Sequence, residues 1–146
     1  MPLYDNALNL IRENLELLEN DGRPKFQAIG YFTAEQFAEI NAFRAKNELH
    51  LLEKNEILYM GRHHYNSRVI RDGYKISDLV LQIESALSEL SKVIIAQRMT
   101  AVQSVTPRAD GYGNTVFDRA VFELTSKKPR AELFSVIPKG DDNRPK

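Results

Sequence analysis

The sequence predicts a single α+β domain in which about three helices, mostly N-terminal, pack on one antiparallel sheet of about four strands. Two observations support this fold class. Apolar residues recur at helical spacing in three segments, all within the first 91 residues. After Lys92 the chain is rich in β-branched residues, and two later segments alternate between apolar and polar positions. A length of 146 residues suits one domain with its own core.

The helices are expected in the first part of the chain. Residues 5–20 should form the first helix, because apolar residues recur there every three or four positions. The second should begin at a capping box whose cap is Thr33 and run to about Lys46. Ser77 is the expected cap of the third helix, which should run to about Ser91.

Between these helices the strand signals are short. Residues 26–32 suit either a short strand or an ordered connector, since Gly30 weakens the strand pattern. The apolar run Glu56–Met60 should be a short strand that ends at Gly61. A helical extension into the residues after Gly61 is the alternative.

The β-rich part begins at Val93. Residues 93–105 suit one long bent strand or two short strands broken near Gln97-Arg98, and Pro107 should end this segment. The antiparallel sheet would therefore be formed mainly by the second half of the chain.

Two further strands should follow. Turns are expected at residues 110–114 and at Ser126–Pro129. The segments 116–124 and 131–137 alternate as strands of a half-buried sheet do. Residues 140–146 should form a loose polar tail. The single domain thus consists of a helical part, residues 1–50, and a second part, residues 56–138.

Composition excludes several classes of site and protein. The chain has no cysteine, so it has neither a disulfide framework nor a thiolate metal site. No Asp, Glu or His cluster has metal-ligand spacing, and we expect no metal and no cofactor. No apolar run is long enough to cross a membrane, and the N-terminus lacks the layout of a signal peptide. A cytoplasmic protein without membrane contact is the expectation.

Charge is divided unevenly along the chain. Residues 1–60 contain six Arg or Lys and ten Asp or Glu, whereas residues 61–146 contain fourteen and ten. The second half therefore has an excess of four positive charges, although the net charge of the whole chain is zero. Such a distribution favours contact of an anionic ligand with the second half, unless the charges are merely scattered over solvated faces.

The stretch from Gly61 to Lys75 is the candidate functional site. It contains two of the three histidines, four Arg or Lys and one Asp. His63 or His64 could act as an acid or base near neutral pH. Arginine guanidinium groups suit phosphate oxygens, and tyrosines can stack on bases. The residues expected to bind substrate are Arg62, Tyr65, Ser67, Arg71 and Tyr74.

A structural role for the same residues is the alternative. One histidine could lie at the surface while the other packs against a tyrosine, and the arginines could pair with acidic residues of the first half. On the functional interpretation, Arg68, Arg119 of one strand and Ser135 of the next would converge with a histidine. Cleavage of a phosphodiester by its neighbouring 2′-hydroxyl needs such a set of groups.

This layout resembles the barnase, EndoU, colicin and RelE-like (BECR) group of metal-independent ribonucleases. The resemblance covers residues 56–138 and rests on the order Arg62-His63-His64, then Ser77-Asp78-Leu79, then the strand Ser135-Val136-Ile137. It implies N-terminal helices before a small antiparallel sheet and RNA as substrate. It also implies catalytic roles for His63, His64, Arg68, Arg119 and Ser135. Residues 1–50 have no counterpart in this group.

Two functions follow as hypotheses. The first is a metal-independent endoribonuclease or toxin-like nuclease, with RNA as substrate and a protein inhibitor as a partner. The second is a non-enzymatic accessory protein of a phage or mobile element. It would use residues 61–75 to bind nucleic acid, another phosphate-bearing ligand or an acidic partner.

Overall fold

A computed structural model describes residues 3–88, 94–95, 101–123 and 128–144 of the chain. These residues form an α+β fold, which confirms the predicted class. The helices are α1 (Ala7–Glu19), α2 (Ala34–Lys46), α3 (Arg62–Tyr65), the π-helix η1 (Asn66–Arg71), α4 (Ile76–Ser88) and the 3-10 helix η2 (Asp141–Asn143). The strands are β1 (Gln27–Tyr31), β2 (Glu56–Tyr59), β3 (Ile94–Ile95), β4 (Ala101–Ala109), β5 (Thr115–Glu123) and β6 (Ala131–Lys139).

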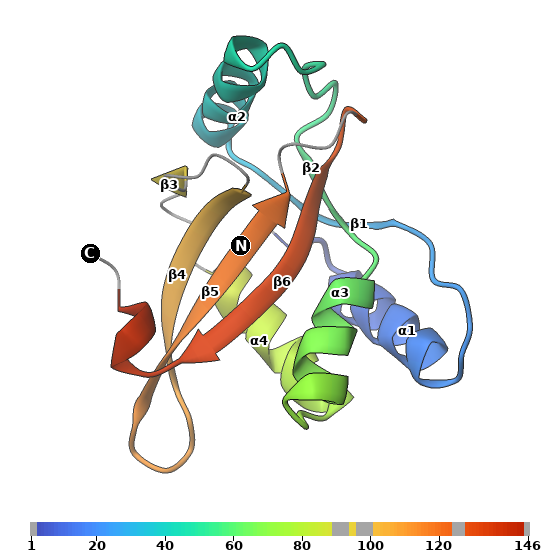
Figure 1. The fold of residues 1–146 in the computed structure, drawn as a ribbon, viewed down its shortest axis with the longest axis vertical. Coiled ribbons are helices and arrows are strands. Elements are labelled where there is room, and N and C mark those ends of the chain that lie inside the picture. Colours follow the sequence, from blue (N-terminus) through green and yellow to red (C-terminus); the bar gives the residue numbers. More distant parts are fainter. Residues whose placement is uncertain (1–2, 89–93, 96–100, 124–127, 145–146) are drawn as a thin grey trace.

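The strands form one sheet in the order β1-β2-β6-β5-β4-β3 (Figure 1). All neighbours in it are antiparallel except β2 and β6, which run parallel with Ile57 opposite Ala131. The expectation of an antiparallel sheet of about four strands was wrong on both points, because the described sheet is mixed and six-stranded. Strands β1, β2 and β3 have only 5, 4 and 2 residues, and segments this short do not show in the sequence which other strands they pair with.

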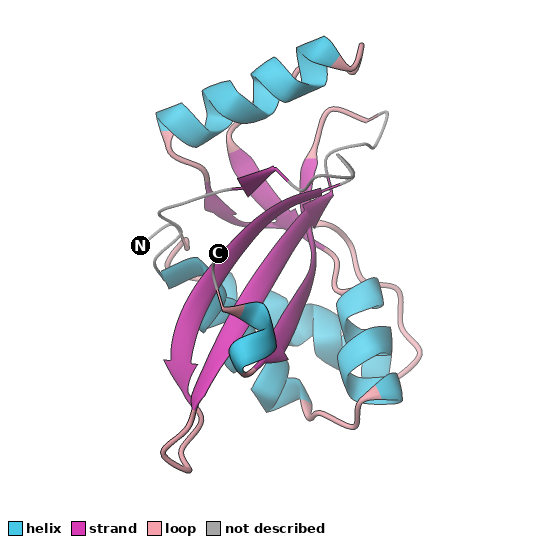
Figure 2. Ribbon diagram, turned by 60° about the vertical axis from the view of Figure 1, so that its left-hand side comes forward, coloured by secondary structure: helices cyan, strands magenta, loops and turns pink. Residues whose placement is uncertain are grey.

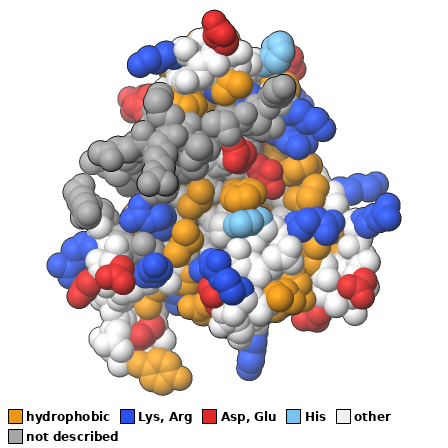
Figure 3. Space-filling model, viewed as in Figure 1, with side chains coloured by type: hydrophobic (Ala, Val, Ile, Leu, Met, Phe, Trp, Pro, Cys, Tyr) orange, Lys and Arg blue, Asp and Glu red, His pale blue; other side chains and the backbone are white. Residues whose placement is uncertain are grey.

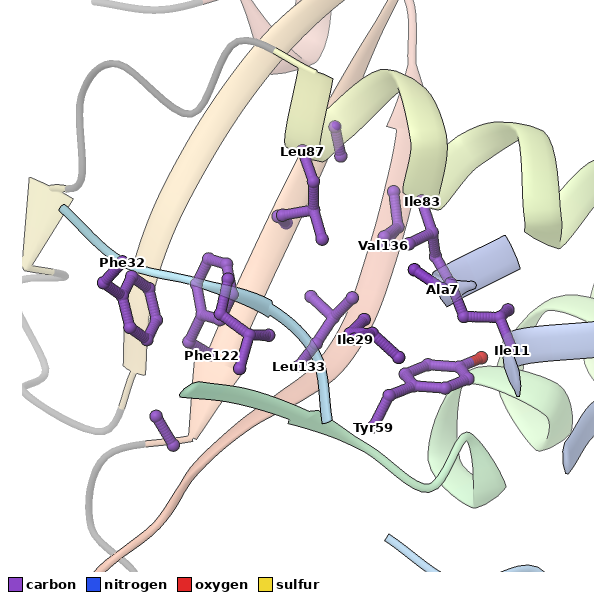
Figure 4. Close-up of a cluster of buried hydrophobic side chains, with 14 of the residues drawn as sticks. Ala7, Ile11, Ile29, Phe32, Tyr59, Ile83, Leu87, Phe122, Leu133 and Val136 are labelled. Atoms are coloured by element: carbon purple, nitrogen blue, oxygen red, sulfur yellow. The ribbon is translucent and has the colours of Figure 1, made fainter. Parts of the chain in front are cut away.

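Helices α1 and α4 cover one face of the sheet (Figures 1 and 2). The hydrophobic core lies between these two layers (Figure 4). Ile11 of α1, Ile83 and Leu87 of α4, and Phe122 and Leu133 of the sheet all belong to this core, and all five side chains are fully buried. The opposite face of β4, β5 and β6 is turned toward the viewer in Figure 1, and no described α-helix crosses it.

Helix α2 stands at one end of the sheet. Its capping box is formed as predicted, since the Thr33 side chain accepts from the Gln36 N–H and the Gln36 side chain accepts from the Thr33 N–H. Arg44 is fully buried and donates to the carbonyls of His50 and Lys128, over 2.6 and 3.0 Å. The second of these bonds joins α2 to the segment that precedes β6.

The other helix predictions need smaller corrections. The first helix is confirmed, with bounds one or two residues inside residues 5–20. Helix α4 begins at Ile76, so Ser77 is inside the helix and is not its cap. The Asp78 carboxylate instead accepts the Lys75 N–H over 2.8 Å and satisfies a free donor of the first turn. Residues 89–91, where this helix was expected to end, lie outside the described residues.

The segment after Val93 forms two strands, as the second alternative stated. Strands β3 and β4 pair antiparallel, with Ile94 opposite Gln103, and the break expected near Gln97-Arg98 falls outside the described residues. The prediction that Pro107 ends the segment was wrong, because β4 continues to Ala109. The described part of β3 pairs only with residues 102 and 103, so at Pro107 this side of β4 is an edge, where proline is tolerated.

The last part of the chain follows the prediction closely. Strand β5 begins one residue before the 116–124 segment and runs to Glu123, the last described residue of that segment, and β6 extends the 131–137 segment to Lys139. The turn at residues 110–114 is held by the Asp110 carboxylate, which accepts the N–H groups of Tyr112 and Asn114. The first half of the turn at Ser126–Pro129 lies outside the described residues. The tail is less loose than expected, since residues 141–143 form η2.

Candidate functional site

Within the stretch from Gly61 to Lys75, the residues after Gly61 are helical as far as Arg71. Strand β2, which precedes this stretch, is formed as predicted. Gly61 has a φ angle of 93°, and a Cβ atom there would lie 2.9 Å from the ring of Tyr59. Glycine is the residue that tolerates both conditions. Successive residues of a helix point about 100° apart. His63 and His64 therefore enter different surroundings.

His64 belongs to the hydrophobic interior. Its side chain is fully buried, with Nδ1 2.9 Å from the Tyr59 hydroxyl and Nε2 3.2 Å from Oε1 of Gln82. The hydroxyl donates to Nδ1 and the Nε2–H donates to the amide oxygen, which requires a neutral ring. Burial lowers the pKa of His64 to about 3, and burial raises the pKa of Tyr59, which keeps its proton. This ring joins β2, α3 and α4.

His63 lies at the surface. Its ring stacks on Phe134 of β6, with centroids 4.0 Å apart and planes 16° from parallel. Nε2 lies 3.3 Å from the hydroxyl of Ser67, one helical turn later. Partial burial, followed by the charges of Arg68 and Arg71, lowers the pKa of His63. The imidazole is therefore neutral at pH 7.

The π-helix η1 directs Arg68 inward and Arg71 outward. Arg68 is 6% exposed, and its Nη1 lies 3.1 Å from Oδ2 of Asp72. Arg71 is exposed, and its Nε donates to Oδ1 of the same carboxylate over 3.0 Å. Hydrogen bonding from Arg71 and the charges of Arg68, Arg71 and Lys139 lower the pKa of Asp72. One carboxylate thus holds two guanidinium groups, while Nε of Arg68 has no partner among the described residues.

A tight turn ends η1 and brings Tyr74 back over it. Gly73 has a φ angle of 79°, and the Tyr74 N–H donates to the carbonyl of Arg68 over 2.8 Å. A bond of this span around a left-handed glycine is typical of a helix C-terminus. The half-buried Tyr74 ring therefore forms one wall of a cleft beside Arg68.

The cleft has a volume of about 560 Å³ and lies between η1 and the end of β6. Arg68, Arg71 and Lys139 supply three positive charges to its lining, and Asp72 supplies one negative charge. Tyr74, Ile137 and Pro138 complete the lining. On the face shown in Figure 3, Lys and Arg side chains lie on both sides of a central histidine and an adjoining hydrophobic side chain.

The position of the cleft follows from how the chain passes β6. Strand β2 pairs in parallel with the start of β6, as far as Glu132. The chain then coils into α3 and η1, which continue along the part of β6 that β2 leaves unpaired. His63 stacks on β6 at Phe134, and Arg68 and Arg71 line one cleft together with Ile137 and Lys139 of β6. The helix thus occupies the place of a strand at this edge.

The structure brings several predicted site residues together. Arg68, Arg71 and Tyr74 line the cleft. His63 lies next to them. Its Nε2 is within hydrogen-bonding distance of the Ser67 hydroxyl, and the charges of both arginines contribute to lowering its pKa. Ser67 is 7% exposed and supports the histidine from within the helix.

Other predicted residues lie elsewhere. His64 is fully buried and cannot contact a ligand at the surface in this conformation. Tyr65 is 8% exposed and belongs to the hydrophobic core, so it offers no stacking surface. Arg62 is exposed on α3 but is not part of the cleft lining.

Arg119 and Ser135 come close to the cleft without lining it. Arg119 of β5 pairs with Ile137, so it lies one strand away from the cleft wall. A bulge at Phe134 interrupts the alternation of β6, so Ser135 pairs with Val121. Ser135 is 3% exposed, and its Oγ has no hydrogen-bond partner among the described residues.

The sequence did not identify the contribution of β6 to the cleft. From the sequence, Ser135 was the residue of this strand expected at the site; Phe134 and Ile137 were recognised only as strand residues, and Pro138 and Lys139 lay beyond the predicted strand. The signal was absent because their role depends on the parallel pairing of β2 with β6, which brings residues about 70 positions apart into contact.

The described residues show no metal site, and comparison with known proteins finds no match. Among the described residues, no three His, Asp or Glu side chains are grouped as metal ligands would be. No helix in the described part of the chain is long and apolar enough to span a membrane. No protein-family model, no curated protein and no solved structure matches the chain. Function must therefore be inferred from the geometry of the cleft.

Proposed function

We propose that this protein binds RNA and holds a backbone phosphate in the cleft between η1 and β6. The observation that supports this proposal is the meeting of Arg68, Arg71 and Lys139 from two distant segments around the single carboxylate of Asp72. Guanidinium groups match phosphate oxygens in shape and charge. Asp72 orients both arginines but leaves the cleft lining with two uncompensated positive charges.

The choice of RNA rests on the order of the segments. A basic segment with histidines, then a helix, then the strands is the order that resembles the BECR ribonucleases. The cleft lining is also made of that basic segment and the final strand of this order. An accessory protein that binds RNA without cleaving it would need the same contacts.

The test is RNA binding by a variant with both exposed cations of the cleft removed. Arg71→Ala combined with Lys139→Ala should weaken binding at least about tenfold and reduce the slope of log K against log salt by about two. Fluorescence anisotropy with a labelled single-stranded RNA measures both quantities.

The matched control removes two exposed cations from other helices, Arg12→Ala with Lys46→Ala. It has the same net charge as the cleft variant and should bind nearly as the parent protein does. Equal losses in the two variants would mean that binding is a property of net charge and would contradict the proposed site.

RNA cleavage is a second candidate function, and the neutral, exposed His63 beside two arginines favours it. His63 would take the proton of a ribose 2′-hydroxyl, and the 2′-oxygen would attack the adjacent phosphorus. The bond from phosphorus to the 5′-oxygen would break, and the imidazolium would return its proton to that oxygen. Arg68 and Arg71 would stabilise the charge that develops on the phosphate oxygens.

This candidate predicts cleavage in the presence of EDTA with a 2′,3′-cyclic phosphate product. His63→Ala should abolish cleavage, and His50→Ala, at an exposed histidine outside the cleft, should leave it unchanged. If RNA stays intact from pH 5 to 8 at protein concentrations that saturate binding, the cleavage function is contradicted and only the binding function remains.

A further inference from the structure

The His63–Phe134 pair has the geometry of a platform for a flat ring. The two rings are close to parallel, with centroids 4.0 Å apart. Phe134 covers one face of the imidazole and Ser67 adjoins its Nε2 edge. His63 is nevertheless an exposed residue, so a ligand could reach the part of its ring outside these two contacts.

Two neighbouring side chains fix the orientation of the His63 ring. Phe134 is half-buried in a bulge of β6, and Ser67 is 7% exposed within η1. The imidazole thus has a fixed partner on each of two sides, so a ligand ring need not order a mobile side chain. The lowered pKa of His63 also means that its ring is uncharged at neutral pH.

The platform and the phosphate cleft lie close together. Phe134 precedes Ile137 of the cleft wall by three positions, about 10 Å along a strand. On the helical side, Ser67 contacts His63 and is followed directly by Arg68. A single ligand that carries both a flat ring and a phosphate can therefore reach both places.

We propose that the outer face of His63 is a base-stacking subsite, and that the ligand of this site is an unpaired nucleotide of a single-stranded RNA. This inference rests on the proposed phosphate cleft. A base stacks on His63 while a phosphate of the same strand lies between Arg68, Arg71 and Lys139. Base-paired RNA is disfavoured, because each base of a duplex already has neighbours on both faces.

The subsite assigns to His63 a role that does not need proton transfer. An aromatic replacement retains a flat ring over Phe134, whereas alanine removes it. His63→Phe and His63→Ala therefore separate stacking from acid–base chemistry, in which both variants are equally deficient.

The experiment compares two labelled probes by fluorescence anisotropy at one salt concentration. One is an oligoadenylate of about eight nucleotides, and the other is an abasic ribose-phosphate oligomer of the same length. The parent protein should bind the oligoadenylate about tenfold more tightly than the abasic oligomer, which is within the range of one stacked base. His63→Phe should retain this preference. His63→Ala should lose it, and its affinity for the abasic oligomer should equal that of the parent protein.

Three outcomes would overturn the subsite: equal binding of both probes by the parent protein, an unchanged preference in His63→Ala, or its loss in His63→Phe when circular dichroism shows the variant folded. The phosphate proposal has a separate readout, since Arg71→Ala with Lys139→Ala should weaken both probes to a similar extent. If this variant binds both probes as the parent protein does, the cleft proposal fails whatever the base preference. Absence of binding by both probes would overturn both proposals.

Discussion

His64 is a histidine that the fold keeps neutral. The residue is fully buried between the Tyr59 hydroxyl and the Gln82 amide, and it is exposed to the positive charge of Arg68 and, once His63 is protonated in acid, to that of His63. Burial, the charge of Arg68 and the charge of His63 all disfavour a proton on this ring, and only the bond to Gln82 favours it. Its protonation is therefore coupled to unfolding.

Acid should destabilise the protein through this residue. The folded chain protonates His64 at a pKa of about 3, and the unfolded chain near 6.5. Between these values the unfolded state holds more protons, so stability rises with pH across this window and is constant above it. His64 should lower the free energy of unfolding by about 2 kcal/mol at pH 5 relative to pH 8.

Urea unfolding at the two pH values measures this difference, and His64→Gln should reduce it by about the same 2 kcal/mol. His50→Gln, at an exposed histidine, serves as the control and should leave the difference unchanged. A pH dependence that is equal in the parent protein and in His64→Gln would show that another group is responsible.

Alanine substitutions at Gly61 and Gly73 should lower the free energy of unfolding by different amounts. Both have positive φ angles, 93° and 79°, but a Cβ atom at Gly61 would lie 2.9 Å from the Tyr59 ring while one at Gly73 would meet nothing within 4 Å. Gly73→Ala should cost about 1 kcal/mol, the conformational penalty alone. Gly61→Ala should cost about 3 kcal/mol or more, because it also displaces the ring that binds His64. Urea unfolding measures both, and equal losses would contradict the steric contribution.

At the scale of elements, the π-helix η1 determines how strongly the cleft attracts anions. Its last turn places the Asp72 carboxylate between Arg68 and Arg71, where an external phosphate would also bind. The Asp72 carboxylate thus competes with an external phosphate for the two arginines, and it also holds both arginines in position. Its removal leaves both guanidinium groups available to a ligand.

Asp72→Asn should therefore tighten binding of single-stranded RNA. Loss of one negative charge about 5 Å from a bound phosphate corresponds to about a fourfold gain in affinity in a fully solvated site. Anisotropy titration in low salt should detect this gain, and the gain should shrink as salt is added. Glu39→Gln on α2, an exposed carboxylate outside the cleft, is the control. Weaker binding by Asp72→Asn would mean that orientation of the arginines outweighs competition.

Elements with strong local signals were predictable, and those that depend on neighbours were not. Helix α2 was evident because Thr33 and Gln36 satisfy each other within one turn. The helical form of residues 62–71 was less evident, because Gly61 precedes it and His63 to Arg68 lack an apolar stripe. The inward position of Arg68 depends on the π-helix, for which the sequence carries no simple pattern.

At the scale of the whole molecule, the cleft and the core share the same strand. Leu133 and Val136 of β6 are buried under α1 and α4, while Ile137 and Lys139 line the cleft. The candidate site could be predicted only in part for the same reason. The Gly61–Lys75 half was visible as a local concentration of charge, and the β6 half required knowledge of which strand lies beside it.

RNA binding and the global fold should therefore be lost together. In a urea titration, anisotropy of bound RNA at saturating protein and far-ultraviolet circular dichroism of that complex should show the same midpoint. Loss of binding at a clearly lower urea concentration would mean that η1 separates from β6 while the sheet remains intact.

The parallel pairing of β2 with β6 also has a consequence for synthesis of the chain. Residues 61–75 leave the ribosome before residues 131–139 do. The walls of the cleft, however, cannot meet until β6 has been made. A nascent chain whose last strand has not yet been made would lack one wall of the cleft, so under the proposed function it could not yet hold an RNA phosphate there.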